Sequence, residues 1–487
     1  MCVRSCNVMK QYTLIASFLI FSTSFAQSDV ELRVIGGVYE DVASTIIPTP
    51  SGGVYALGST SSQSDGTVRG YIVYYDSDFE YAWSILTPSG SVVENIVDGI
   101  LVDGTDDIKV LSKKHGSNGT YNSVIHYVTN SQASGEITTS IEIEHEENQT
   151  PATFVRWMGS TYIIGDTEGD CWMLNVDDQL SLETGDYQVW GHPAMLEKVE
   201  TAKVHNDSLY VVGSTIDDGI EQATVWSWGT TGNPLWANIG PDDGAFGFTY
   251  ANDIAPYEGG ASLLYSLQRE GAPIGNGVVN FSQGDGVPSS IVTTASPYYR
   301  EGKKIIKYEG SLIKLSHTNV YGNDENVKIT RLNQDGWHDI GYYLGSGFHE
   351  EPIDFSIDDN GVIWIVGNAL GYLNGSTSIF IYRVSSFDIL AEYQGENIPL
   401  SITNDPMLYN SVGIDEPAQE LILYPNPASI QAILSETSNW TLLSTSGYVC
   451  AQGIGQSIDI SGLRNGFYLV KVERSNSSVV IPLQVLN

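Results

Sequence analysis

The chain has 487 residues, of which 41% are hydrophobic and only 16% charged, and its 58 acidic against 22 basic residues give a net charge of −36. A chain of this length exceeds what one hydrophobic core usually serves, so we expect more than one domain. The hydrophobic and aromatic content excludes a disordered chain. The negative field disfavours binding to nucleic acid or to anionic lipid surfaces.

Residues 1–26 have the order of a signal peptide. Lys10 is followed by the apolar run LIASFLIF (14–21) and then by small residues, which predicts cleavage between Ala26 and Gln27. The apolar run is too short to cross a bilayer, and no later stretch reaches about 18 apolar residues. We therefore expect an exported chain that does not span a membrane. The alternative is a buried N-terminal strand.

Residues 41–395 repeat with a period of about fifty residues. In each repeat a short apolar strand ends in Gly or Ser, and a polar loop and further strand-like segments follow it. Four short strands per repeat without helical periodicity are typical of a β-propeller blade. We predict an all-β chain with a seven-bladed β-propeller over residues 27–395. The seven landmark strands end at Gly58, Ser112, Gly165, Gly213, Ser266, Ser316 and Gly367.

The segment VELRVIGG (30–37) precedes the first full repeat. We predict that it supplies the outer strand of the last blade and so locks the ring. Such closure hides sheet edges that would otherwise pair with other chains.

Two turns, ETGDYQVW (183–190) and TTGNPLW (230–236), resemble the repeat of quinoprotein-type and outer-membrane assembly propellers. Quinoproteins carry adjacent cysteines at the cofactor, whereas Cys171 is followed by Trp172. The resemblance therefore supports the architecture, and we expect no cofactor.

The position thirteen residues before the end of each landmark strand is predicted to lie in the inner strand, nearest the channel. We expect its charged occupants to form a lopsided polar funnel that binds a ligand. The alternative is a solvated channel without a specific ligand. The occupants are Glu200, Asp253, Lys303 and Asp354 in the later repeats, and Thr45, Gly99 and Ala152 in the earlier ones.

Motifs of metalloproteases, serine hydrolases, phosphate-binding loops and paired-cysteine sites do not occur in the sequence. The sequence HEE at 145–147 and 349–351 fits a solvated acidic surface, because neighbours on an extended chain point to opposite faces. Asp-rich turns fit hairpin geometry better than calcium loops. We assign no catalytic, cofactor-binding or metal-binding residues.

Residues 396–419 lack the repeat and are predicted to be a linker, and residues 420–487 are predicted to form a small β-sandwich. In YPNP, each proline fixes its own φ and forces the preceding residue to be extended, so the strand LILY (421–424) must stop and turn there. Alternating apolar runs separated by turn sequences follow.

This C-terminal pattern resembles the type A sorting domain of proteins exported by the type IX secretion system of Bacteroidetes. The resemblance covers about the last 67 residues and rests on YPNPAS, a hairpin at Ser446-Gly447 and IDISGLRNGFYLVKVE, in that order. It implies recognition by the outer-membrane secretion machinery. A carbohydrate-binding or fibronectin-like terminal module is the alternative. The matching positions are Tyr424, Pro425, Asn426, Pro427, Gly447, Leu463, Gly466 and Tyr468.

The sequence favours a binding protein that is exported through the periplasm to the cell surface or the medium. We expect a polysaccharide or another envelope component as its ligand, because Tyr and Trp side chains stack on sugar rings. The alternative is an extracellular glycan-active hydrolase or lyase with its site at the channel mouth. It would need two carboxylates about 5–10 Å apart, for which Glu200, Asp253 and Asp354 are candidates.

Overall fold

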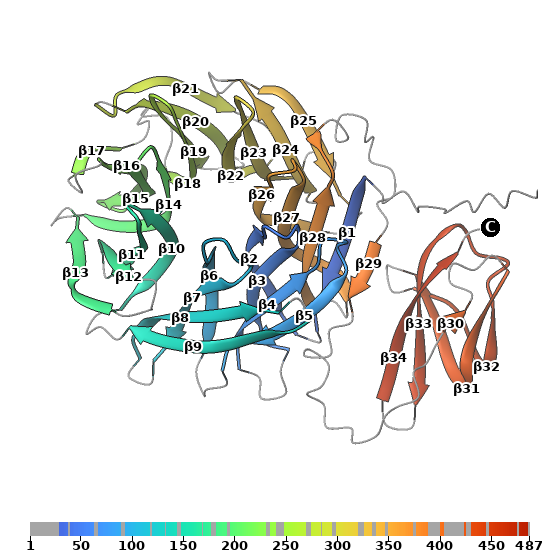
Figure 1. Cartoon of the computed structure of the whole chain (residues 1–487). Helices are drawn as coiled ribbons and strands as arrows, with labels where there is room; N and C mark the ends of the chain where they lie inside the picture. The colour runs from blue at the N-terminus through green and yellow to red at the C-terminus, as the bar shows by residue number, and fades with distance from the viewer. Residues whose placement is uncertain are drawn as a thin grey trace, which may run out of the picture. The chain divides into compact units, whose positions relative to one another are not determined.

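The computed structural model of the chain divides into two compact units, residues 1–412 and 413–487. Both units are built from β-strands (Figure 1). Within the described ranges, no helix has the length and apolar character needed to cross a membrane. The structure describes residues 29–37, 39–62, 67–88, 93–116, 119–131, 133–143, 148–167, 169–176, 182–191, 195–229, 234–239, 248–268, 274–283, 285–294, 299–319, 326–333, 338–345, 349–373, 376–387, 400–403, 423–424, 430–444, 448–474 and 477–485.

The described strands of the first unit form seven sheets arranged in a ring (Figure 1). In six of these sheets the strands follow chain order, and in the seventh β1 is inserted between β28 and β29. The first strand of each sheet lies nearest the centre, which is the topology of a β-propeller. The sheets are numbered 1 to 7 in this order: β2–β5 (Asp41–Pro48, Val54–Thr60, Arg69–Tyr75, Tyr81–Leu86), β6–β9 (Glu94–Leu101, Ile108–His115, Tyr121–Asn130, Gly135–Ile143), β10–β13 (Thr150–Trp157, Ser160–Thr167, Asp170–Val176, Leu182–Trp190), β14–β17 (Leu196–His205, Ser208–Asp217, Ile220–Trp228, Pro234–Ile239), β18–β21 (Phe248–Tyr257, Gly260–Gln268, Gly275–Ser282, Pro288–Thr294), β22–β25 (Arg300–Tyr308, Ser311–Thr318, Asn326–Leu332, His338–Leu344) and β26–β28 (His349–Ile357, Ile363–Leu373, Ser376–Val384) with β1 (Val30–Ile35) and β29 (Leu400–Thr403).

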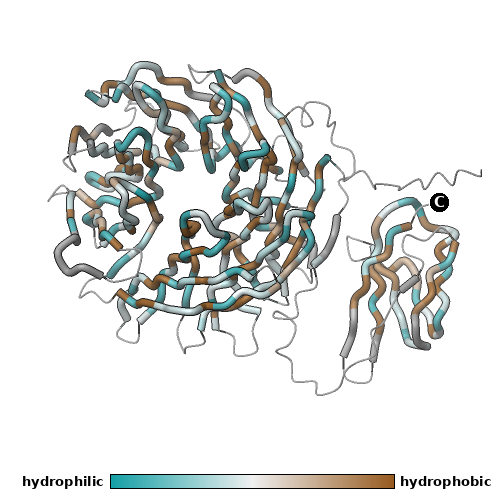
Figure 2. Tube along the Cα trace, viewed as in Figure 1, coloured by the Kyte–Doolittle hydropathy of each residue, from teal (hydrophilic) through white to brown (hydrophobic). Residues whose placement is uncertain are grey.

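The landmark strands are the second strands of the sheets, and they are buried on both faces. In β3, for example, Val54 and Ala56 pack toward sheet 7, whereas Tyr55 and Leu57 pack toward sheet 2. Alternate residues of one strand thus serve two different interfaces, which explains the nearly continuous apolar runs. Hydrophobic residues accordingly recur along the strands of both units (Figure 2). Each of the seven interfaces between neighbouring sheets has its own buried cluster.

The predicted closure of the ring by residues 30–37 is confirmed. Strand β1 pairs antiparallel with β28 over six residues, from Val30 opposite Val384 to Ile35 opposite Ile379. The two ends of the propeller sequence therefore share one sheet. The first sheet also packs on the last through one apolar cluster that contains Ala43 and Trp364.

Part of the predicted linker, residues 396–419, belongs to the last sheet instead. Residues Leu400–Thr403 form β29, which pairs in parallel with β1, so β1 is the fourth strand of five and not the edge. The sequence LSIT has too short an apolar run to stand out from its polar surroundings.

The C-terminal unit is all-β with a core of its own. Its strands β30 (Leu423–Tyr424), β31 (Gln431–Ser444), β32 (Val449–Asp459), β33 (Gly466–Arg474) and β34 (Ser477–Val485) are hydrogen-bonded into one connected sheet. Strand β31 is central: β32 pairs with it on one side, and β30 and then β33 on the other. An irregularity between Ile433 and Ser438 bends β31, so that Ala432 and Leu442 from its two halves join one core.

Three residues of the predicted sorting motif have defined structural roles in this unit. Leu463 packs against the core, and the Tyr468 hydroxyl donates a hydrogen bond to the Arg464 carbonyl at 3.0 Å. Gly466 begins β33 with a φ of 155°, at the extended edge of the positive region that favours glycine. The signal-cleavage residues Ala26 and Gln27 and the motif residues Pro425, Asn426, Pro427 and Gly447 lie outside the described residues, as does the side chain of Tyr424.

We predict that Leu32→Ala weakens the closed ring. Leu32 is fully buried on β1, in the cluster between sheets 6 and 7, and truncating such a leucine costs about 2–5 kcal/mol. The denaturation midpoint of the propeller in urea should fall accordingly. Val42→Ala on β2 is the control, because Val42 is 41% exposed and should change the midpoint little. Equal midpoints for the two variants would contradict closure by β1.

Candidate functional site

The first strand of every sheet in the propeller carries one β-bulge. At the same place in each strand, pairing with the second strand skips one residue. A bulge turns an additional side chain away from the regular pattern. The skipped residues, here called the bulge residues, are Ser44, Val97, Ala152, Glu200, Asn252, Lys303 and Ile353.

All seven bulge residues line a cavity of about 410 Å³ in the central channel. The residues that follow them, here called the post-bulge residues, line it in six of the seven sheets, and Tyr250, Ala251 and Glu301 complete the wall. The post-bulge residues are Thr45, Asp98, Thr153, Thr201, Asp253, Lys304 and Asp354.

The predicted funnel residues lie at the centre of the ring but not at one equivalent position. Glu200 and Lys303 are bulge residues that line the cavity. Asp354 is a post-bulge residue that also lines it, whereas Asp253 is a post-bulge residue outside the lining.

The offset of thirteen residues does not give equivalent positions, because the turn between the first two strands differs in length from sheet to sheet. Two residues separate the paired ends Trp157 and Ser160 in sheet 3, whereas the corresponding turn in sheet 2, between Leu101 and Ile108, has six. The residue equivalent to Thr45 in sheet 2 is therefore Asp98 and not Gly99, and in sheet 3 it is Thr153 and not Ala152. Polar side chains thus occur all round the ring.

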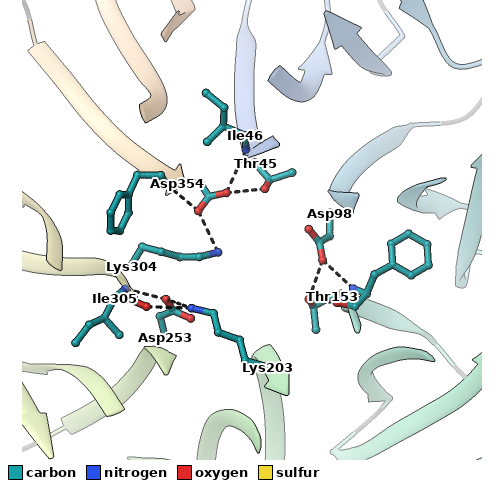
Figure 3. A network of polar contacts seen from close by, with 11 residues as sticks. Thr45, Ile46, Asp98, Thr153, Lys203, Asp253, Lys304, Ile305 and Asp354 are labelled. Carbon is teal, nitrogen blue, oxygen red and sulfur yellow. Dashed lines mark hydrogen bonds and ion pairs between the residues drawn. The ribbon is translucent and has the colours of Figure 1, made fainter. Parts of the chain in front are cut away.

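The post-bulge aspartates join neighbouring sheets. Asp354 in sheet 7 accepts hydrogen bonds from the Thr45 hydroxyl at 2.6 Å and from the backbone N–H of Ile46 at 3.1 Å, both in sheet 1 (Figure 3). Asp98 in sheet 2 repeats this contact in sheet 3, accepting from the Thr153 hydroxyl and the Phe154 N–H at 2.7 Å each. We call this arrangement the carboxylate clamp.

Asp253 makes the third clamp, with a lysine in place of the threonine. Its Oδ2 accepts from the Ile305 N–H of sheet 6 at 2.8 Å and from Lys203 Nζ at 2.7 Å (Figure 3). Lys203 also donates to the Ile305 carbonyl at 3.0 Å. Burial lowers the pKa of Lys203, and the Asp253 charge opposes that shift.

Lys304 balances the charge of these aspartates. Its Nζ lies 3.0 Å from Asp354 Oδ1. Burial disfavours the charged amine, but Asp354, Asp253 and Asp98 outweigh burial and raise the pKa of Lys304. Burial is also the main cause that raises the pKa of Asp98, against the hydrogen bonds from Thr153 and Phe154. The polar groups of the clamp residues are therefore already engaged in contacts between neighbouring sheets.

Glu200 is different, because its side chain faces the cavity and no clamp contact engages it. Enclosure by the protein raises the pKa of Glu200 to about 7, and the nearby charges of Asp166 and Glu221 add to the shift. Its side chain still meets solvent inside the channel, so water screens part of the effect. Glu200 is thus a carboxyl group that holds its proton to higher pH than an ordinary glutamate.

Lys303 sits in an ion-pair network at the interface of sheets 6 and 7. Its Nζ lies 2.8 Å from Glu301 Oε2 and 2.9 Å from Glu351 Oε1, and this network raises the pKa of Lys303 against burial. The carboxylates and the buried His317 have ligand atoms within 4.8 Å of one another, a spacing that suits a metal ion. We interpret the cluster as an ion-pair network, because the ammonium of Lys303 already pairs with both carboxylates. The sequence did not predict this group, since its members come from three strands.

A second group not predicted from the sequence lies within sheet 2. His126 Nδ1 is 2.7 Å from Ser140 Oγ, and its Nε2 contacts Glu94. The chemical order resembles a hydrolase triad. However, Ser140 is on the outer strand β9, and none of the three residues lines the channel cavity. We interpret the group as a buried histidine whose two nitrogens both have partners.

No known family model and no curated protein matches the chain. Among solved structures it is similar to the β-propeller domain of the Trilobed protease from Pyrococcus furiosus, at 12% identity and a TM-score of 0.42, covering 71% of this chain and 94% of that chain. It is also similar to the quinohemoprotein alcohol dehydrogenase from Comamonas testosteroni, at 9% identity and a TM-score of 0.41, covering 74% and 77%. A glucose dehydrogenase matches at 9% identity and a TM-score of 0.39, covering 72% and 98%. The sheet topology defines the class of this protein, an all-β chain with a propeller.

We predict that Asp253→Asn destabilises the propeller by on the order of 3 kcal/mol, because it leaves the amine of Lys203 without its buried counter-charge. The free energy of unfolding should recover in part in Asp253→Asn/Lys203→Met, giving a coupling energy between the two sites. Asp217→Asn, at an exposed aspartate of sheet 4, is the matched control. Additive effects of the two substitutions would contradict the clamp.

Proposed function

We propose that the protein is an exported β-propeller that binds its ligand in the central channel. The observation that carries the proposal is the cavity of about 410 Å³, to which every one of the seven sheets contributes its bulge residue. This volume falls in the range typical of small-molecule sites.

The lining favours a ligand with many hydroxyl groups. Glu200 and Glu301 accept hydrogen bonds, Lys303 donates them, and Asn252 and Tyr250 do both. Acids and bases together suit an uncharged polar molecule better than a strong anion or cation. We therefore propose the terminal sugar units of a polysaccharide or another envelope glycan as the ligand class.

The C-terminal unit supports the proposal of export. Its resemblance to type IX sorting domains places motif residues at Leu463, Gly466 and Tyr468, and these hold the core and the turn before β33. We infer that the unit presents a fixed surface to the outer-membrane secretion machinery and that the propeller is its cargo, delivered to the cell surface or the medium.

A glycan-active enzyme is the second candidate. The pKa of about 7 at Glu200 suits a general acid at neutral pH. A partner carboxylate would have to come from Glu301, since Asp253 and Asp354 hold the clamps. Release of reducing ends from any glycan that binds, abolished by Glu200→Gln, would establish the enzyme in place of the binding protein.

We predict that a glycan array identifies a ligand of the full chain and that Glu200→Gln weakens its binding on the order of tenfold to a hundredfold, by removing a charged acceptor. Binding to the wild type should strengthen as pH rises through about 7, because Glu200 then loses its proton. The variant should lack this step. Asp217→Asn serves as the control, because Asp217 is exposed and does not line the cavity. Unchanged affinity of Glu200→Gln would place the ligand elsewhere.

We predict that deleting residues 420–487 stops surface delivery in a native host, so that the propeller accumulates in the periplasm. Cell fractionation with an antibody against the propeller measures this. Leu32→Ala in the full-length chain is the control for a destabilised propeller with an intact C-terminal unit. Surface delivery of the truncated chain would refute the sorting function and leave channel binding open.

A further inference from the structure

A second, smaller cavity of about 30 Å³ lies between sheets 5 and 6. Three basic side chains line it: Arg300 on β22, Lys314 on β23 and Lys328 on β24. Both lysines are more than nine-tenths buried. The residues lining the cavity include no carboxylate, although the chain has 58 acidic residues.

The period of the strands brings these groups to one face of sheet 6. Lys314 lies opposite Thr330 across β23 and β24, and Ser316 lies opposite Lys328. Because alternate residues of a strand share a face, all four point into the interface with sheet 5. The other six interfaces between sheets contain more buried hydrophobic residues. The cluster between sheets 5 and 6 has six buried hydrophobic residues, the fewest of the seven interfaces.

Several donors in this cavity have no partner among the described residues. The hydroxyls of Ser316 and Thr330 and the Nε of Arg300 are buried without a hydrogen bond, and the two hydroxyl residues are 2% and 1% exposed. Lys314 Nζ has a single partner, the Asn276 carbonyl oxygen at 2.7 Å. Leaving buried donors unsatisfied is costly, so these atoms indicate a missing acceptor.

The charges of the three basic side chains also indicate a missing negative partner. Burial is the largest cause that lowers the pKa of Lys314 to about 7 and of Lys328 to about 8, and the positive charge of Arg300 adds to both shifts. No ion pair to a carboxylate is found for these three side chains in the described part of the chain. A negative charge in the cavity would relieve the mutual repulsion of the cations.

We propose that this cavity binds one small inorganic anion of halide size. The volume exceeds the ~10–15 Å³ that one water molecule needs but leaves no room for a sugar or nucleotide phosphate. The hydroxyls of Ser316 and Thr330, Arg300 Nε and Lys314 Nζ are its donors. The anion would link sheets 5 and 6, the pair of neighbouring sheets with the smallest buried apolar cluster.

Thermal unfolding of the full chain at pH 7 tests the proposal, with sodium chloride compared with sodium gluconate at equal ionic strength. We expect the unfolding temperature to rise with chloride and to saturate, because an ion that binds only the folded state stabilises it. Lys314→Met should lose this chloride-specific rise whatever its own stability. Lys307→Met, an exposed lysine on β22 with the same change of charge, should keep it.

Thr330→Val keeps the shape of the side chain and removes one donor, so it should raise the chloride concentration at half-saturation several-fold. Crystals soaked in bromide should show an anomalous peak between Ser316 and Thr330. A wild type that responds equally to chloride and gluconate, or a cavity that contains only water after the bromide soak, would overturn the proposal.

Discussion

One β-bulge in the innermost strand of every sheet determines which side chains reach the centre of the ring. An unbroken strand would alternate its side chains between the two neighbouring interfaces, and none would face the channel. The bulge adds one residue, which lines the cavity, and turns the next toward the adjoining sheet. Ring closure and the candidate site therefore depend on the same local irregularity. A substitution that straightens one bulge would alter both.

The repeat and the second strands were predictable, because a strand buried on both faces leaves a continuous apolar run such as VYALG in the sequence. The pairing of β1 with β28 was predictable because a propeller needs its edges covered. The register of the inner strands could not be predicted, because the turn that follows each inner strand has two to six residues and so shifts the register from sheet to sheet. Nor could the clamps be predicted, because Asp98 meets Thr153 only when two sheets pack. Strand β29 is too short for its pattern to be distinctive.

The distribution of positive charge is informative in so acidic a chain. With 22 basic residues against 58 acidic ones, the sequence still places Lys203 and Lys304 beside the clamp aspartates and Lys314 in a cavity without carboxylates. Burying an amine is favourable only with a counter-charge or after loss of its proton. The first two lysines meet their counter-charges within the chain. Lys314 has no counter-charge among the residues that the structure describes. The same physical rule therefore gives structural pairs in the channel and a candidate anion site between sheets 5 and 6.

The bulge residues and the post-bulge residues differ in their chemistry, and this difference indicates that they have different roles. The post-bulge positions hold only Thr, Asp and Lys, which are the types that can bridge sheets by short hydrogen bonds and ion pairs. The bulge positions hold Ser, Val, Ala, Glu, Asn, Lys and Ile, a set without a common interaction. A position that must join sheets restricts its residue, whereas one that faces a cavity does not. In the proposed channel site, a substitution at Glu200 would therefore change the specificity for a ligand while the clamps keep the ring closed.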